Sequence, residues 1–207
     1  VTTKDYDAMK VHFANSCTNR FCPICSWTKA KKDALMLAVL MEAIYTEKEY
    51  EFVFVTLTIP NVVADDLEPS IRRLNGALSK LFRRKIFQKV NKGYVRKLEV
   101  TYNDKEYITK EMFYNARSYF EARELYIGDK NPNFDTYHPH IHLLVAVNSS
   151  YFTSRDYIKR DTWLKNWREV YGDQSITQVD VRKVNSKPQQ VSEDSTFSQD
   201  VTKEGHF

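Results

Sequence analysis

The stretch DTYHPHIHLLVAV, residues 135–147, contains three histidines at alternate positions: His138, His140 and His142. The stretch then runs directly into an apolar sequence that has the composition of a β-strand. Because side chains alternate along a strand, the three imidazoles share one face and the apolar residues between them point to the other. A lone histidine usually satisfies its ring nitrogens within the structure. Two at this spacing instead favour a shared divalent cation.

Glu99 could supply a third ligand from a neighbouring strand. It lies in the sequence KLEVTY between Leu98 and Val100, so its carboxylate points away from the apolar face of that strand. A carboxylate placed in this way beside the histidines would complete a metal site. A solvated strand residue has the same spacing, and the pattern alone leaves both interpretations open.

The three cysteines form a second cluster with the spacing C-x4-C-x2-C, at Cys17, Cys22 and Cys25, and His12 lies five residues upstream. An odd, clustered count in an apparently intracellular protein favours a metal site over disulfides. Plant-type 2Fe–2S clusters use this spacing, but they need a fourth cysteine that the chain lacks. Four nitrogen and sulfur ligands suit tetrahedral Zn²⁺. We therefore expect structural zinc at these four residues, in preference to buried thiols.

The rest of the chain alternates helical and strand patterns. The patterns predict helices over residues 27–47, 66–90 and 153–171, and strands over residues 50–59, 93–102, 140–147 and 175–184. Asp65 or Asp66 is the predicted N-cap of the second helix. A polar, aromatic-rich insert covers 103–136, and the tail around 190–203 has a weak helical pattern. This alternation does not decide whether the strands pair parallel or antiparallel.

Composition places the chain among globular proteins. Of its 207 residues 42% are hydrophobic and 28% charged, and the formal net charge is +4. No apolar run is long enough to cross a bilayer and no secretion signal is evident, so we expect a cytoplasmic protein with no membrane partner. Basic residues concentrate within eighteen positions, at Lys80, Arg83, Arg84, Lys85, Lys89, Lys92, Arg96 and Lys97. This cluster would attract phosphates, although a solvated helix face is an equal alternative for any single lysine.

Several motifs together resemble, in order, the plasmid-encoded Rep family of Gram-positive bacteria, which initiate rolling-circle replication. These motifs are CTNRFCPICSWTKAKKDA, FVTLTIPN, YVRKLEVTYN, HPHIHLLVAV, NSSYFTSRDYIKRDTWLKNWREVYG and SITQVDVRKV. The fourth looks like the family's HUH motif, histidine–hydrophobic–histidine. The resemblance covers about residues 12–200. It implies an α+β fold with a central antiparallel sheet flanked by helices, the HUH endonuclease fold. A zinc-binding N-terminal segment at residues 1–30 would precede a nuclease domain at residues 31–207.

The same resemblance implies a site-specific single-strand DNA endonuclease and strand transferase. Its Mg²⁺ or Mn²⁺ would be held by His140, His142 and Glu99. The implied partners are single-stranded or hairpin origin DNA and a host helicase. The residues expected to contact DNA are Arg20, Lys29, Arg83, Arg84, Lys85, Tyr137 and His138.

The family's nucleophile is a tyrosine near the C-terminus, preceded one helical turn earlier by a glutamate that activates water. The matching segment here is VSEDSTFSQD, which places Glu193 at the glutamate and Phe197 at the tyrosine. A phenyl ring has no oxygen and cannot bond to phosphate. Three explanations fit the phenylalanine at this position: a deliberate Tyr→Phe substitution, a naturally inactive homologue, or a different register of the tail. We favour the substitution.

Two other functions remain as alternatives. A zinc-containing DNA-binding protein that never cuts would bind tightly without divalent ions. A relaxase or transposase would use the same histidine chemistry for conjugation or transposition, but the cysteine-rich segment and the motif order favour the replication initiator.

Overall fold

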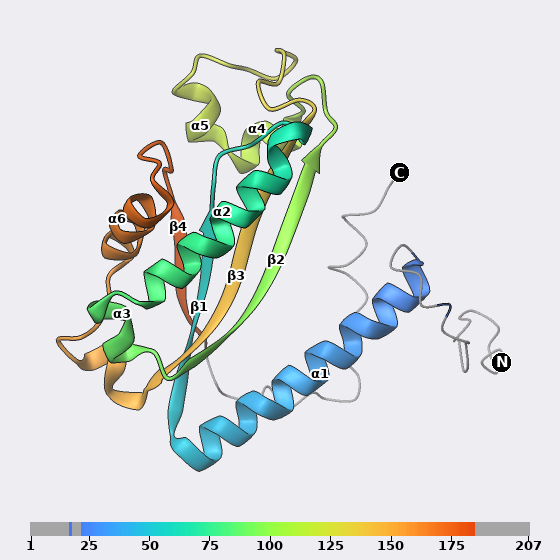
Figure 1. The fold of residues 1–207 in the computed structure, drawn as a ribbon. Coiled ribbons are helices and arrows are strands. Elements are labelled where there is room, and N and C mark those ends of the chain that lie inside the picture. Colours follow the sequence, from blue (N-terminus) through green and yellow to red (C-terminus); the bar gives the residue numbers. More distant parts are fainter. Residues whose placement is uncertain (1–16, 18–21, 185–207) are drawn as a thin grey trace. The chain divides into compact units, whose positions relative to one another are not determined.

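The computed structural model describes residue 17 and residues 22–184 (Figure 1). The chain divides into two compact units, residues 1–49 and 50–207. The first unit contains helix α1 (Pro23–Lys48), which confirms the helix predicted over 27–47. It begins with a proline, where the missing N–H costs no hydrogen bond, and ends at Glu49 in the left-handed conformation (φ 54°). Because α1 runs through residue 30, both sides of the predicted domain boundary lie on one helix, and that boundary stays a prediction.

The second unit is built on a four-stranded sheet in the order β2-β3-β1-β4. All three neighbouring pairs are antiparallel. This confirms the expected α+β architecture with an antiparallel sheet. The strands are β1 (Tyr50–Thr58), β2 (Gly93–Asn103), β3 (Thr136–Asn148) and β4 (Val179–Val184). The histidine strand is therefore longer than its predicted range, 140–147, and lies between two neighbours.

Helices cover one face of this sheet, with α2 crossing in front of the strands in Figure 1. They are α2 (Ala64–Phe82), α3 (Lys85–Val90) and α6 (Arg160–Tyr171). Helix α6 is shorter than the helix predicted over 153–171, because a 3-10 turn (Ser149–Thr153) and a loop precede it. Two further short helices, α4 (Lys110–Asn115) and α5 (Arg117–Glu121), lie in the connection between β2 and β3.

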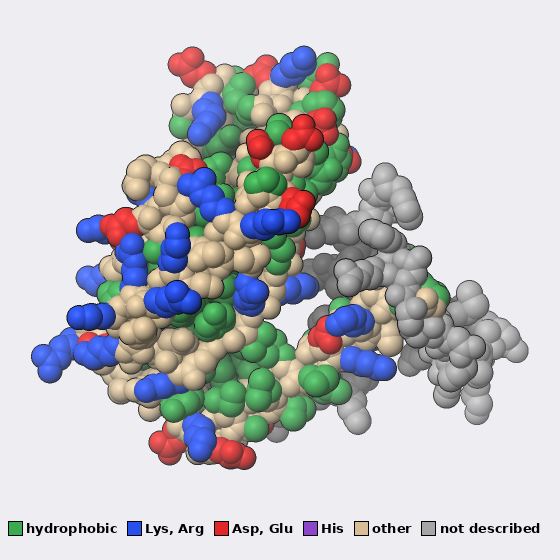
Figure 2. Space-filling model, viewed as in Figure 1, with side chains coloured by type: hydrophobic (Ala, Val, Ile, Leu, Met, Phe, Trp, Pro, Cys, Tyr) green, Lys and Arg blue, Asp and Glu red, His purple; other side chains and the backbone are tan. Residues whose placement is uncertain are grey.

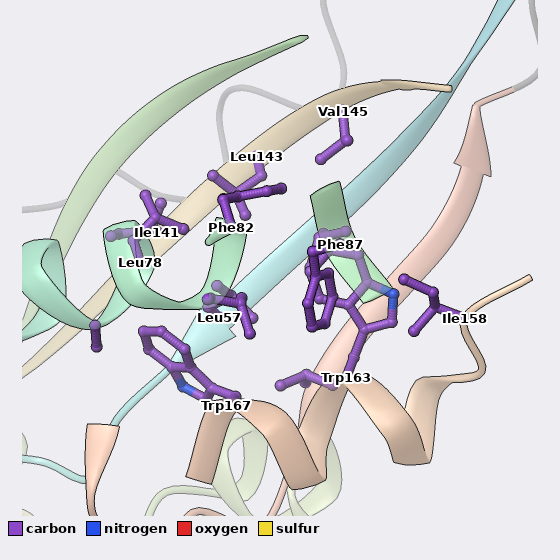
Figure 3. Close-up of a cluster of buried hydrophobic side chains, with 14 of the residues drawn as sticks. Leu57, Leu78, Phe82, Phe87, Ile141, Leu143, Val145, Ile158, Trp163 and Trp167 are labelled. Carbon is purple, nitrogen blue, oxygen red and sulfur yellow. The ribbon is translucent and has the colours of Figure 1, made fainter. Parts of the chain in front are cut away.

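The main core fills the space between the sheet and these helices (Figure 3). Alternate residues of β1 and β3 point into it, and α6 contributes Trp163 and Trp167, which are 2% and 0% exposed. Their spacing of four residues places both rings on one face of α6. Trp167 also donates its Nε1 hydrogen to the Thr58 carbonyl at 2.8 Å, which ties α6 to the end of β1. Other buried members are Leu57, Leu74, Leu78, Leu81, Phe87, Ile141, Leu143, Val145 and Ile158.

The helix predicted over 66–90 is interrupted. Arg84 has an extended backbone (φ −70°, ψ 136°) between α2 and α3. The break turns Phe87 into the core, where its ring packs edge-on against Trp163 with the ring centroids 4.6 Å apart. The predicted N-cap was wrong as well, because Val63 holds that position. Asp65 and Asp66 lie in the first turn, where their charges favour the positive end of the helix dipole.

The connection over residues 103–136 forms a small core of its own from Ile108, Phe113 and Phe120. Its aromatic residues had given no periodic signal, because the two helices are only six and five residues long. Within the described ranges, no helix has the length and apolar character needed to cross a bilayer. The tail around residues 190–203, predicted to be helical, lies outside the described residues.

The alternation of β3 can be tested with two adjacent leucines. Leu143 is 1% exposed in the main core, whereas Leu144 points to the opposite face and is only partly buried. Leu143→Ala is expected to lower the free energy of unfolding by about 2–5 kcal/mol, because it removes buried methyl groups and leaves a cavity. Leu144→Ala should cost about 1 kcal/mol. Equal losses in urea denaturation would contradict the assignment of the two faces.

Candidate metal centre

Glu99, His140 and His142 converge on the face of the sheet opposite α2, α3 and α6. One ligand atom from each lies within 4.8 Å of the others. The Glu99 carboxylate spans both rings: Oε1 lies 3.7 Å from His140 Nε2 and Oε2 lies 3.2 Å from His142 Nε2. The side chains are 49%, 11% and 28% exposed, in the order Glu99, His140, His142. The group is thus partly shielded and still accessible from one side.

Strand register produces this convergence. Glu99 on β2 is directly opposite His140 on β3, and Thr56 on β1 is directly opposite His142. Residues that face each other across two antiparallel strands have side chains on the same face. Ile141, which lies between His140 and His142, is by contrast buried in the main core.

The hydrogen bonds of the histidines prepare their Nε2 atoms for a ligand. His140 Nδ1 lies 3.2 Å from the His138 carbonyl, which can only accept, so Nδ1 carries the hydrogen. Its Nε2 is then a lone pair in the neutral ring. His142 Nδ1 lies 3.1 Å from Thr56 Oγ1, and a hydroxyl can either donate or accept there. Both rings therefore have an outer partner on Nδ1, the arrangement usual for metal-binding histidines.

The donor set fits a divalent cation. His140 Nε2 lies 3.7 Å from Glu99 Oε1, which is too far for a hydrogen bond. A cation between the two atoms would attract both of them, because each can present an electron pair. Two imidazoles and one carboxylate can hold Mg²⁺, Mn²⁺ or a similar ion while leaving further positions for water or substrate.

His138 lies on the same face without joining the three ligand residues. Its ring centroid is 5.5 Å from that of His140. Burial lowers the pKa of His138, and the neighbouring His140 lowers it further. The structure therefore makes His138 a supporting residue through its carbonyl, which orients His140.

The cysteine cluster is a second candidate metal site, at the start of α1. Cys17, Cys22 and Cys25 have sulfurs within 4.8 Å of one another, and Sγ of Cys17 and Cys25 are 3.5 Å apart. Thiolates around one tetrahedral zinc would be separated by about 3.8 Å, from Zn–S bonds of about 2.3 Å. The three sulfurs are thus close to the required spacing. His12, the predicted fourth ligand, lies outside the described residues.

Within the second unit, the residues expected to contact DNA do not form one cluster. Tyr137 points to the helix-covered side of β3, where its ring lies 4.9 Å from that of Tyr102. Lys29 on α1 is paired with Asp33 at 2.7 Å. Arg84 bonds to Asn166 and Glu169 of α6, whereas Arg83 and Lys85 beside it are exposed. Arg20, Glu193 and Phe197 lie outside the described residues.

Thr56 is the site residue that the sequence pattern did not identify. The available signal was a threonine at a polar position of an otherwise apolar strand, in VTLT. That signal acquires meaning only when β1 is known to pair with β3, because the two strands are far apart in the chain.

The four-stranded antiparallel sheet, with Glu99, His140 and His142 on the face opposite its helices, defines an α+β protein with a candidate metal centre on its sheet. The chain belongs to the Rep_1 family of replication proteins, whose model matches residues 8–204. This confirms the resemblance to the Rep proteins of Gram-positive bacteria.

Curated relatives carry the same description. The chain is 45% identical over 185 residues to a "Protein rep" of Staphylococcus aureus, covering 89% of this chain and 69% of the relative. It is 29% identical to a "Protein rep" of Streptococcus pneumoniae serotype 2 and 29% identical to one of a Bacillus species. Each of these two alignments covers 86% of this chain, which spans about half of each relative, 48% and 49%. No solved structure matches.

The His-His-Glu centre can be tested by Mn²⁺ titration, followed by electron paramagnetic resonance. Glu99→Gln removes the charged ligand and is expected to weaken Mn²⁺ binding by more than about tenfold. Thr56→Val should weaken it by about 10–100-fold, because the outer partner of His142 is lost. Glu106→Gln makes the same charge change at an exposed position of the β2–β3 connection and should leave the affinity unchanged. Equal effects of all three substitutions would place the ion elsewhere.

Proposed function

We propose that this chain is a plasmid rolling-circle replication initiator of the HUH endonuclease type, which binds single-stranded or hairpin origin DNA for nicking and rejoining. The observation that carries the proposal is the convergence of His140, His142 and Glu99 in a chain of the Rep_1 family. A host helicase is a further expected partner. The proposal also holds that Phe197 occupies the position of the nucleophile, so that this chain binds the origin without cutting it.

The chain's own residues hold and orient the scissile phosphate in this proposal. His140 and His142 present two Nε2 lone pairs, and Glu99 reaches both with its two oxygens. A bound Mg²⁺ or Mn²⁺ would act as a Lewis acid that neutralises phosphate charge and aligns the reacting bond. Thr56 keeps the His142 ring from rotating through its contact with Nδ1. The partial burial of His140 limits the water around the phosphate.

Nicking requires an oxygen nucleophile. A tyrosine at position 197 would attack phosphorus after losing its hydroxyl proton, and the bond from phosphorus to the 3′ oxygen would break. The products would be a 5′-phosphotyrosine and a 3′-hydroxyl, and the expected role of Glu193 is to activate the water that ends the cycle. Phe197 offers no oxygen and cannot take the first step.

Chain length is compatible with that position. β4 ends at Val184, which is directly opposite Phe52 on β1. Phe52 lies four residues before Thr56, or about 13 Å along the strand. The thirteen residues from 184 to 197 can span about 40 Å when extended and about 20 Å as a helix. Either exceeds the required distance, which supports the proposal without fixing the position of the tail.

Restoring the nucleophile tests the proposal directly. Phe197→Tyr is expected to nick a labelled single-stranded origin oligonucleotide in Mn²⁺ and to form a covalent protein–DNA adduct visible on a denaturing gel. The unchanged chain should bind the same oligonucleotide and form no adduct, because it lacks the attacking oxygen.

The controls separate the possible failures. Combining Phe197→Tyr with Glu99→Gln should abolish the adduct by at least about a hundredfold, because the phosphate loses its cation. If Phe197→Tyr binds the DNA but forms no adduct, the nicking proposal is refuted. Cleavage by the unchanged chain would show that another tyrosine is the nucleophile. An adduct that survives Glu99→Gln would contradict the role of the metal centre.

The second candidate function is a zinc-containing DNA-binding protein, and the observation that favours it is the clustering of three cysteine sulfurs. We propose that this cluster holds one structural Zn²⁺ together with His12. This site is compatible with either function, because it would shape the N-terminal unit and take no part in phosphate chemistry.

Zinc content tests the cysteine site. The purified chain is expected to contain about one zinc per molecule by mass spectrometry of the metal, and Cys25→Ser should lose most of it because a thiolate ligand is removed. Met36→Ser is the control, since Met36 is an exposed sulfur residue on the same helix, 72% exposed. Zinc-free protein, or equal loss in both variants, would argue against the site.

A further inference from the structure

The net charge of the chain is distributed very unevenly. Residues 69–98 contain ten Lys and Arg and no Asp or Glu. Residues 155–169 add five basic residues and three acidic ones. Together the two segments carry a net charge of +12, so the remaining residues carry −8 to give the chain's +4. A small overall charge therefore conceals a strongly basic region.

These segments form α2, α3, α6 and the loops beside them, which pack on one face of the sheet. Figure 2 shows Lys and Arg side chains spread over the surface of these helices. The metal centre lies on the opposite face, because His140 and His142 alternate with core residues of the same strand. The sheet and a layer of helices, the latter about 10 Å thick, separate the two surfaces.

Some of the basic residues hold the fold together. Arg84 pairs with Glu169 and Lys89 pairs with Asp156, and both pairs connect α3 or its N-cap to the segment around α6. Accordingly, the Arg84 guanidinium lowers the pKa of the Glu169 carboxyl. Arg73 donates to the carbonyl of Tyr171. These interactions use part of the acidic and polar groups available in this region.

Arg72, Arg160 and Arg168 also have partners within the fold. Five exposed basic residues have no such role. We define the basic helical face as the exposed residues Lys80, Arg83, Lys85, Lys159 and Lys165. Among the described residues, none of these five forms an ion pair or a side-chain hydrogen bond. They come from the end of α2, from α3 and from α6 with its N-cap. Such a concentration of uncompensated charge costs stability through self-repulsion. A polyanionic ligand would remove that cost.

Two features indicate which polyanion fits. Surfaces that hold unpaired strands combine positive charge with aromatic rings for base stacking. Among the strongly exposed apolar residues, Ile86 is the only one on α2, α3 or α6, which the structure describes throughout. The two segments do contain two exposed aromatic residues outside these helices, Tyr94 and Tyr157, but their rings already contact Phe82 and Tyr151. Charge without stacking groups is suited to the phosphate backbone of a duplex, whose bases are already stacked.

We propose that the basic helical face binds the phosphate backbone of double-stranded DNA, on the side of the sheet opposite the metal centre. In the context of the proposed function, this surface holds the duplex next to the nicking region while a single strand occupies the metal centre. The binding itself is independent of sequence and needs neither the metal nor a nucleophile. The proposal extends the proposed function but can be tested without any nicking.

Charge reversal tests the surface in the full chain. The triple variant Lys80→Glu, Arg83→Glu, Lys85→Glu is compared with a matched triple, Lys105→Glu, Lys110→Glu, Lys130→Glu, in the β2–β3 connection. The probe is a blunt-ended 30-base-pair duplex of arbitrary sequence, measured by fluorescence anisotropy from 50 to 200 mM salt. The first triple is expected to lower affinity by at least about a hundredfold at 100 mM salt and to reduce the slope of log K against log salt by about 3. The matched triple should keep both values near those of the unchanged chain.

Three further measurements keep the result interpretable. Thermal unfolding should be nearly unchanged, because the three reversed residues are exposed and make no ion pair or side-chain hydrogen bond with the described residues. If stability falls strongly, the comparison is repeated with Lys159→Glu and Lys165→Glu. Glu99→Gln should bind the duplex normally, which separates this surface from the metal centre. Nicking of a short single strand by Phe197→Tyr should be unaffected by the triple.

Two results would overturn the proposal. One is an equal loss of duplex affinity in both triples, which would mean that only total charge matters. The other is an equal loss of affinity for an oligothymidine strand and for the duplex in the first triple, which would assign the surface to single strands. If Phe197→Tyr proves unable to nick, the proposed function fails, but the duplex measurement still decides this inference.

Discussion

The pairing of β3 with β1 on one side and β2 on the other is the constraint on which the rest of the structure depends. It places Thr56 opposite His142 and Glu99 opposite His140. A shift of one residue would turn the histidines toward the helices and the core residues away from them. Register therefore decides at once whether the core can be buried and whether the metal centre exists.

The main core holds this register in place. Ile141 and Leu143 are 0% and 1% exposed, so slipping β3 would expose them and bury imidazoles beside Trp167. Burying an unsatisfied polar ring lowers the stability of the fold by about 1–3 kcal/mol, which is several times less than the cost of burying a charge. The bond from Trp167 to the Thr58 carbonyl adds a directional restraint at the end of β1. The site thus rests on rigid strands, as accurate placement of ligands requires.

The sequence predicted those parts of the site that depend on local alternation. The period of two in HPHIH placed His140 and His142 on one face, and the neighbours of Glu99 oriented its carboxylate. Thr56 could not be predicted, because its role arises from pairing between residues 86 positions apart. The break at Arg84 was missed for a similar reason. Residues 80–89 contain no Gly or Pro that would end a helix, and the turn is set by the packing of Phe87 against Trp163.

The two faces of the sheet also differ in how their charges are balanced. On one face, a single carboxylate and two imidazoles lie close enough together to hold a cation. On the other, Glu169 and Asp156 pair with Arg84 and Lys89. Among the described residues, Lys80, Arg83, Lys85 and Lys159 form no ion pair, and Lys165 only contributes to lowering the pKa of Glu169. Folding alone would favour mixed charge on a helix surface, because like charges repel. A phosphodiester chain carries the negative charge that the basic helical face lacks. The group of Glu99, His140 and His142 has the opposite need, because its carboxylate and ring nitrogens would hold a phosphate only through a bound cation. The two imbalances therefore have opposite signs, and the packing of the protein explains neither of them.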